Sequence, residues 1–342
     1  MSKKKNKQGN KVVRDLKECF RSFNLPVNKL KGTHDDPMNV VFTSQLCNDQ
    51  ACAFVAVTFD RFRGYIGMDA AALHFKIPQE RMGETLTLLN LLNEIRPICS
   101  YSVCPCCNTV SYRTALFLSG ETLPVSKFRR LIQDMLEETY LCFPLISKVA
   151  TDGNPKDLHA RFMDDHKHLM SMESKLSQKA IKEILDGMGQ VMANLKIPIH
   201  ERLSDGFVTD LMLEGMDFPV RIGVTLVKEY ELVKLSVGPA FTVPDDKIPV
   251  MLDLVNRINR AFGPDHMFIN QQSKRVILVN GILIDNGTLD KRELELSLQI
   301  LRGKGRLLFH TINEQLSSNE SPEDLFEKTI KYHEKIIENQ NV

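Results

Sequence analysis

The feature that most constrains the fold of this chain is an internal repeat. Residues 78–135 align without a gap on residues 244–301 when they are shifted by 166 positions. The coinciding identical pairs include Pro78/Pro244, Leu86/Leu252, Leu88/Leu254, Asn90/Asn256, Asn93/Asn259 and Leu123/Leu289. A repeat of this length indicates two copies of one folding unit.

The two copies predict the same order of elements. Each begins with an amphipathic helix, continues with three strands, a helix and two strands, and closes with a second amphipathic helix. The expected strands are 40–42, 54–59, 65–68, 98–103 and 110–118 in the first copy, and 207–213, 220–226, 232–237, 267–270 and 276–284 in the second. This α-β-β-β-α-β-β-α order is typical of an α+β unit with a mainly antiparallel sheet and helices packed on it.

The remaining segments fall outside the two units. The first ten residues are rich in lysine and predict a flexible basic tail. The run Arg302-Gly-Lys-Gly-Arg306 is interpreted as the end of the last helix of the second copy. The expected organisation is a tail over 1–10, a first domain over 11–148, a linker over 149–175, a second domain over 176–316 and a charged terminal helix over 317–342.

Composition argues against several functional classes. The 44 basic and 43 acidic residues nearly cancel and tryptophan is absent, so a nucleic-acid partner is not indicated. No apolar run reaches the ~18 residues that a membrane-spanning helix needs. The basic N-terminus lacks the apolar stretch of a secretory signal, which favours the cytoplasm. No HExxH, G-x-S-x-G or phosphate-binding loop is present, so we do not expect an enzyme.

The cysteines are the candidates for chemistry beyond folding. All eight lie in the first half of the chain. Cys104 and Cys107, in a Cys-Pro-x-Cys turn followed by Asn108, resemble a zinc-knuckle turn in which two thiolates chelate one ion. Cys47 and Cys52 would complete a four-thiolate site.

Three interpretations of these thiols stay open: a zinc site, redox-active thiols, and inert cysteines kept reduced by the cytoplasm. Cys106 is expected to point away from the ion, and the second copy, with Asn270 and Ser273 at the corresponding turn, is expected to bind none. Zinc is the single cofactor that the sequence suggests.

The paired asparagines have a structural and a functional interpretation. Asn90 and Asn93, like Asn256 and Asn259, are three residues apart, so each pair shares one helix face. They are either ligand contacts or groups that bond the backbone of an adjoining strand. Their presence in both copies favours the backbone role.

The Asn-x-x-Asn helix of each copy is followed by a break, a strand pair and a polar entry to the closing helix. In the second copy these are the helix 254–259, a Gly-Pro break, strands within 266–284 and Asn286-Gly287-Thr288-Leu289-Asp290. This arrangement resembles the YbjN-type domain, a bacterial sensory-transduction regulator family with the type III secretion chaperone-like fold. The resemblance covers roughly residues 11–148 and 175–315 and implies a non-enzymatic role.

Two functional hypotheses follow, and an enzyme of unrecognised mechanism is the third and least favoured alternative. The first is a protein-interaction module, chaperone-like or a signal-transduction regulator, that binds a protein partner as a pseudo-dimeric monomer or as a homodimer. The second is a metal- or redox-responsive protein that uses the cysteines of the first domain. The identity of the partner is not encoded in any motif of the sequence.

Overall fold

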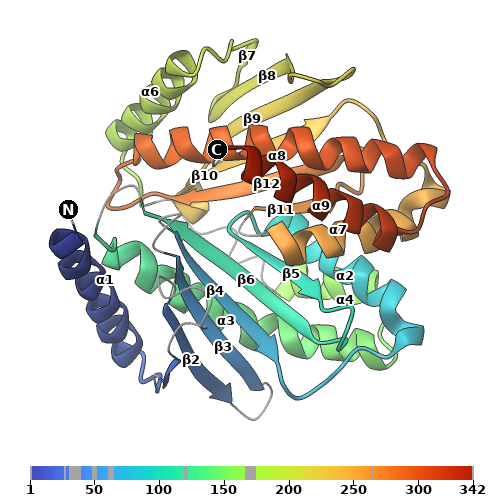
Figure 1. The fold of residues 1–342 in the computed structure, drawn as a ribbon, viewed down its shortest axis with the longest axis horizontal. Helices are drawn as coiled ribbons and strands as arrows, with labels where there is room; N and C mark the ends of the chain where they lie inside the picture. The colour runs from blue at the N-terminus through green and yellow to red at the C-terminus, as the bar shows by residue number, and fades with distance from the viewer. Residues whose placement is uncertain are drawn as a thin grey trace.

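A computed structural model describes residues 2–26, 28–30, 40–47, 52–60, 65–118, 122–165, 175–262 and 265–340. Within these residues the chain forms two six-stranded antiparallel sheets with helices packed against them (Figure 1). The predicted α+β class with antiparallel strands is therefore confirmed. No helix in this described part is long and apolar enough to span a membrane.

The first sheet has the strand order β1-β2-β3-β4-β6-β5. Its strands are β1 (Asn28–Leu30), β2 (Val40–Cys47), β3 (Cys52–Asp60), β4 (Tyr65–Ala72), β5 (Cys99–Val103) and β6 (Val110–Phe117). The accompanying helices are α1 (Ser2–Ser22), α2 (Met82–Ile95), which follows the short helix η1 (Gln79–Arg81), and α3 (Val125–Thr151). The helix α4 (Pro155–Asp165) leads towards the second half.

The second sheet has the order β7-β8-β9-β10-β12-β11, read from the opposite edge. Its strands are β7 (Glu201–Arg202), β8 (Gly206–Met212), β9 (Pro219–Val227), β10 (Leu232–Pro239), β11 (His266–Ile269) and β12 (Val276–Leu283). The helices are α6 (Gln178–Asn194), α7 (Ile248–Phe262), α8 (Lys291–Ser317) and α9 (Pro322–Gln340), with short helices η2 (Lys228–Tyr230) and η3 (Asp245–Lys247). Each sheet thus contains one short edge strand, β1 or β7, beyond the five strands that the sequence predicts.

In each sheet, the last two strands form a hairpin that joins the sheet in the same way. β6 pairs with β4 and leaves β5 at the edge, and β12 pairs with β10 and leaves β11 at the edge. Alternation explains which face is covered: in β3, the side chains of Ala53, Val55, Val57 and Phe59 are buried, while Phe54 is exposed. The buried face of the first sheet packs on α1 and α3, and that of the second on α6 and α8.

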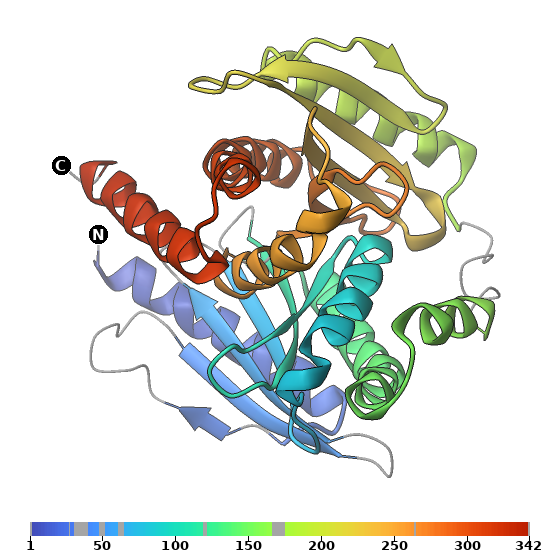
Figure 2. The ribbon, with the colours of Figure 1, turned by 90° about the vertical axis from the view of Figure 1, so that its right-hand side faces the viewer.

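The two halves meet along the helices α2 and α7 and the edge strands β5 and β11. The helices lie side by side (Figure 2), and each also contacts the edge strand of the other half. These two helices and two edge strands therefore form a continuous interface between the two halves of the chain.

One predicted helix end is wrong. Helix α8 continues through residues 302–306 to Ser317, because the apolar stripe resumes with the buried residues Leu308, Phe309 and Ile312. A Cβ on Gly305 would lie 3.2 Å from the Phe309 ring and 3.5 Å from Val237, so this glycine permits close packing of the helix on the sheet. Helix α1 begins at Ser2, so residues 2–10, for which the sequence predicts a flexible basic tail, are helical in the structure, and their flexibility stays a prediction.

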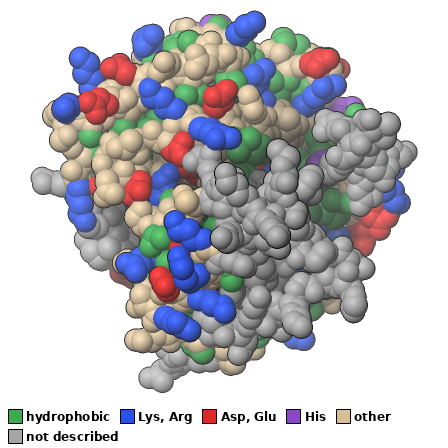
Figure 3. Space-filling model, turned by 60° about the vertical axis from the view of Figure 1, so that its left-hand side comes forward, with side chains coloured by type: hydrophobic (Ala, Val, Ile, Leu, Met, Phe, Trp, Pro, Cys, Tyr) green, Lys and Arg blue, Asp and Glu red, His purple; other side chains and the backbone are tan. Residues whose placement is uncertain are grey.

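The terminal helix follows the sequence more closely. α9 covers most of the segment predicted as a charged helix, and it packs against α7 and α8. Leu325 of this helix is fully buried. Charged side chains of both signs are interspersed over the described part of the face in Figure 3.

Candidate functional site

The turn between β5 and β6 holds three cysteines at the tip of a hairpin. The backbone N–H of Cys104 donates to the carbonyl of Thr109 at 2.9 Å, and the N–H of Asn108 donates to the carbonyl of Cys104 at 2.8 Å. Asn108 has a φ of 54°, the left-handed conformation that asparagine tolerates better than most residues. The local sequence therefore builds the compact turn that the Cys-Pro-x-Cys-Asn pattern predicts.

The corresponding turn of the second half has the same backbone bonds without thiols. There the N–H of Asn270 donates to Arg275 and the N–H of Lys274 donates to Asn270, each at 2.9 Å. The Asn270 Oδ1 accepts from the backbone N–H of Ser273 at 2.8 Å and from its hydroxyl at 2.7 Å. A turn of this shape folds with amide and hydroxyl groups, so the thiols of the first half are not needed for folding.

The three thiols converge at the hairpin tip. The sulfur atoms of Cys104, Cys106 and Cys107 lie within 4.8 Å of one another, and those of Cys104 and Cys106 are 3.0 Å apart. Cys104 is buried, whereas Cys106 and Cys107 are exposed. Burial opposes ionisation of Cys104, but hydrogen bonds from Cys106 and Cys107 outweigh it and lower its pKa to about 7. A thiolate is therefore available near neutral pH, and thiolates are the form that binds soft metal ions.

The structure groups the predicted ligands differently from the sequence pattern. It brings Cys104 and Cys107 together, and it adds Cys106, which a knuckle turn would point away. Cys52 lies in β3 and is disulfide-bonded, so it offers no free thiolate. Two strands separate β3 from β5, which places the Cys52 backbone about 14 Å from that of Cys104 across the sheet. The side chain of Cys47 lies outside the described residues.

The disulfide differs from the expectation of reduced thiols throughout. The backbone of Cys47 stands directly opposite that of Cys52 in the β2–β3 ladder. Directly opposed residues of antiparallel strands have Cα separations within the range that disulfides require. The free thiols of Cys99 and Cys142 are buried, and burial raises the pKa of each well above its usual value. These two thiols are consequently neutral and unreactive.

The asparagines form two kinds of contact. Asn93 bonds both the N–H and the carbonyl of Tyr101 in its own half, at 2.7 and 3.0 Å, and Asn259 bonds those of Met267 at 2.6 and 2.8 Å. The predicted backbone role is therefore confirmed for Asn93 and Asn259, since each satisfies the edge strand beside its helix.

The other two asparagines bond across the halves. Asn90 bonds the N–H and carbonyl of Ile269 in β11 at 2.7 and 2.8 Å. Asn256 bonds those of Val103 in β5 at 2.7 and 3.0 Å. Each residue of the second contact lies 166 positions from its counterpart in the first, so the two contacts are reciprocal. Through these contacts, α2 and α7 are each hydrogen-bonded to the edge strand of the opposite sheet.

A buried ion pair also joins the halves. The Lys127 ammonium lies 2.6 Å from a carboxylate oxygen of Glu293, and both side chains are less than a tenth exposed. Burial raises the pKa of the Glu293 carboxyl, while the nearby Lys127 cation lowers it. The two residues lie in the first turns of α3 and α8 and are again 166 positions apart.

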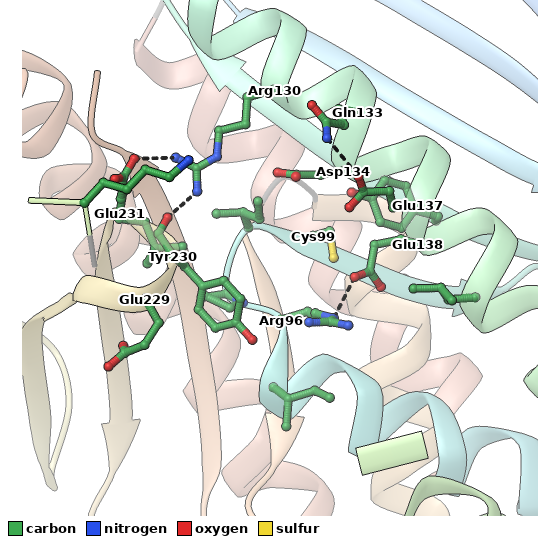
Figure 4. Close-up of a pocket in the computed structure, with 17 residues that line it drawn as sticks. Arg96, Cys99, Arg130, Gln133, Asp134, Glu137, Glu138, Glu229, Tyr230 and Glu231 are labelled. Atoms are coloured by element: carbon green, nitrogen blue, oxygen red, sulfur yellow. Dashed lines mark hydrogen bonds and ion pairs between the residues drawn. The ribbon is translucent and has the colours of Figure 1, made fainter. Parts of the chain in front are cut away.

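A cavity of about 400 Å³ lies between the halves (Figure 4). It is bounded by the end of α2, the start of β5, one face of α3 and the η2–β10 connection of the second half. Nothing in the sequence indicates it, because the charged residues of α3 that line it have the pattern of a solvated helix face. The wall that closes it comes from a segment about a hundred residues later in the chain.

Comparisons with protein-family models, curated proteins and solved structures give no match. Function must therefore be inferred from the geometry of the thiol cluster, the seam between the halves and the cavity.

Proposed function

We propose that the chain consists of two copies of one YbjN-like α+β unit, with the type III secretion chaperone-like fold, arranged as a pseudo-dimer. The reciprocal asparagine contacts support this arrangement, because Asn90–Ile269 and Asn256–Val103 repeat with the offset of the sequence repeat. The identical strand order of the two sheets supports it independently. In this arrangement one chain supplies both halves of an interface that a homodimer would build from two chains.

We further propose that the protein is a non-enzymatic interaction module, chaperone-like or a signal-transduction regulator, that binds a protein partner. The observation that carries this proposal is an apolar patch on the outer face of the first sheet. Phe54 is 41% exposed and Leu73 is 52% exposed. Phe54 is paired with Ala71, so Leu73 lies diagonally beside it on the same face. Exposed aromatic and aliphatic side chains that lie together are typical of a protein-binding surface.

Affinity capture from the native cell followed by mass spectrometry tests this role. We expect the intact chain to retain at least one protein that the double variant Phe54→Asp/Leu73→Asp loses, because charge on the patch opposes burial of an apolar partner. Met212→Asp is the matched control, since Met212 is an exposed apolar side chain in the second half. Identical sets of captured proteins from all three chains would rule out the patch as the binding surface.

The thiol cluster supports a second function, in which the protein responds to a soft metal ion such as zinc or to oxidants. Three thiols whose sulfur atoms lie within 4.8 Å of one another need only modest side-chain rotation, with loss of their protons, to reach Zn–S distances of about 2.3 Å. The fourth position of a tetrahedral site would then be open to solvent or to a partner. Such an open position is compatible with a signalling role, because it allows exchange of the ion.

Elemental analysis of reduced protein purified without chelator tests the metal site. We expect about one zinc per chain, reduced severalfold in Cys106→Ser and in Cys107→Ser. Because zinc competes with the proton of Cys104, whose pKa is about 7, the affinity should fall as the pH drops from 8 to 6. The control is Cys142→Ala, which removes a buried thiol outside the hairpin. Less than about a tenth of an equivalent in the unmodified chain would exclude the site.

A further inference from the structure

The cavity between the halves has an excess of negative charge. Five carboxylates line it, from Asp134, Glu137, Glu138, Glu229 and Glu231, together with three cationic side chains, from Arg96, Arg130 and Lys175. Negative charge gathered in a partly enclosed space raises the local concentration of cations. The sign of the field therefore favours a positively charged ligand.

The two arginines of the wall already have carboxylate partners. Arg96 lies 2.8 Å from Glu138, which also accepts a hydrogen bond from the Tyr101 hydroxyl at 2.7 Å. Arg130 donates to the carbonyl of Tyr230 and lies 3.8 Å from Glu231. Figure 4 shows both guanidinium groups directed at these partners. An anionic ligand would have to displace an existing ion pair, so these arginines do not form an anion site.

Two polar groups of the cavity lack such partners. No hydrogen bond or ion pair joins Asp134 to the other lining residues drawn in Figure 4, and its carboxylate projects from α3 towards the cavity. Burial raises the pKa of Asp134 to about 7, although the Arg130 cation lowers it. The Tyr112 hydroxyl is fully buried and has no hydrogen-bond partner among the described residues, with only the weakly polar Cys99 thiol beside it. Polar groups in an enclosed place are normally satisfied, so the partly buried Asp134 carboxylate indicates a missing ligand group, whereas the Tyr112 hydroxyl has no surface open to the cavity.

The rest of the wall is apolar and aromatic. Ile98, Leu141 and Leu232 line the cavity, and the Tyr230 ring projects into it from the second half (Figure 4). An aromatic face attracts an organic cation, and aliphatic walls accept a hydrocarbon chain. A hydrated inorganic cation needs converging oxygen ligands instead. Among the described residues, the one group with metal-ligand spacing is the cysteine hairpin.

We propose that this cavity binds a small organic cation, a primary amine or guanidinium carried on a short aliphatic chain. The ammonium or guanidinium group donates to the Asp134 carboxylate. The aliphatic chain packs on Ile98 and Leu232, and the Tyr230 ring lies against the cation. The proposal is independent of the thiol cluster and of the apolar patch, because it uses none of their residues.

Calorimetric titration with three defined probes tests this site. The probes are butane-1,4-diamine, pentylamine and 4-guanidinobutylamine, and butane-1,4-diol and pentan-1-ol are the neutral controls of matched length. We expect at least one cation to bind with a Kd below about 1 mM, and both alcohols to bind at least tenfold more weakly. The cation should also raise the Tm of the chain, because it binds the folded state.

Variants of the full chain assign the binding to the cavity. Asp134→Asn keeps the shape of the side chain but removes its charge, and should weaken binding of the cation at least tenfold. Glu229→Gln, at an exposed position of the cavity wall, should weaken binding of the cation about twofold. Asp186→Asn removes an exposed carboxylate on α6 and should leave the Kd unchanged.

Three results would overturn the proposal. The first is that none of the three cations binds. The second is that the alcohols bind as tightly as the amines. The third is that the Kd is the same in Asp134→Asn and Glu229→Gln as in the unmodified chain. Because Glu229 is on the surface, that variant still tests the site even if Asp134→Asn fails to fold.

Discussion

Replacement of Lys127 by methionine is expected to lower the free energy of unfolding by about 3–5 kcal/mol, because it leaves the buried carboxylate of Glu293 without its partner. Urea denaturation at pH 7 measures the change. The double variant Lys127→Met/Glu293→Leu should recover most of the loss, since it replaces the ion pair by apolar groups of similar volume.

The loss of unfolding free energy in Lys127→Met should depend on pH in a defined direction. Burial raises the pKa of the Glu293 carboxyl, and removal of the Lys127 cation removes an influence that lowers it. A carboxyl whose pKa is raised in the folded state destabilises the protein once the pH exceeds its ordinary range. The loss should therefore be smaller at pH 5 than at pH 8. Lys179→Met is the control, because Lys179 forms an exposed pair with Glu183 at 3.8 Å and should matter little. Equal losses in Lys127→Met and Lys179→Met would contradict the prediction.

Replacement of Asn256 by alanine is expected to separate the unfolding of the two halves. The change leaves the N–H and carbonyl of Val103 unpaired at a buried seam, at a cost of about 2–4 kcal/mol for the two groups. Because this bond joins α7 to the first sheet, its loss weakens the contact between halves more than either half itself. Scanning calorimetry should then show two transitions in place of one.

The matched control is Asn259→Ala, one helical turn away. Asn259 makes the same pair of bonds to Met267, but within the second half. We expect a similar loss of stability with a single transition retained. Hydrogen exchange should locate the difference, with faster exchange at the Val103 amide in Asn256→Ala and at the Met267 amide in Asn259→Ala. One transition in both variants would refute the assignment of Asn256 to the coupling of the halves.

The asparagine pairs illustrate how much of the site the sequence predicts. Their spacing of three residues places both side chains on one helix face, and the backbone role of Asn93 and Asn259 follows correctly. The spacing does not predict that Asn90 and Asn256 bond the opposite half. It does not indicate which strand lies next to the part of the helix face that carries these two residues. The contact depends on how α2 and α7 pack, and helix packing is set by side chains distant in the sequence.

The errors have equally specific causes. Two glycines between basic residues in 302–306 have the composition of a helix end, but the buried side chains that follow stabilise the helix beyond them. The knuckle pattern predicts that Cys106 points away from its neighbours, whereas its sulfur lies 3.0 Å from that of Cys104. The residues around Asp134 in the sequence have the pattern of a solvent-exposed helix face. The segment that covers Asp134 in the structure is η2, which belongs to the other half. When a segment distant in the sequence covers a side chain, the sequence around that side chain carries no sign of it.

The pairing of Lys127 with Glu293 bears on what the proposed pseudo-dimer permits. The two residues occupy equivalent places in the repeat and touch each other, so in a symmetrical dimer of identical subunits each would meet its own copy. Lysine would then face lysine, or glutamate would face glutamate, in a buried setting. Opposite charges at that point become available only when the two subunits are encoded separately or joined in one gene. In the proposed pseudo-dimer, a single chain thus permits a charge pattern that a dimer of identical subunits forbids, and the two halves are then no longer interchangeable.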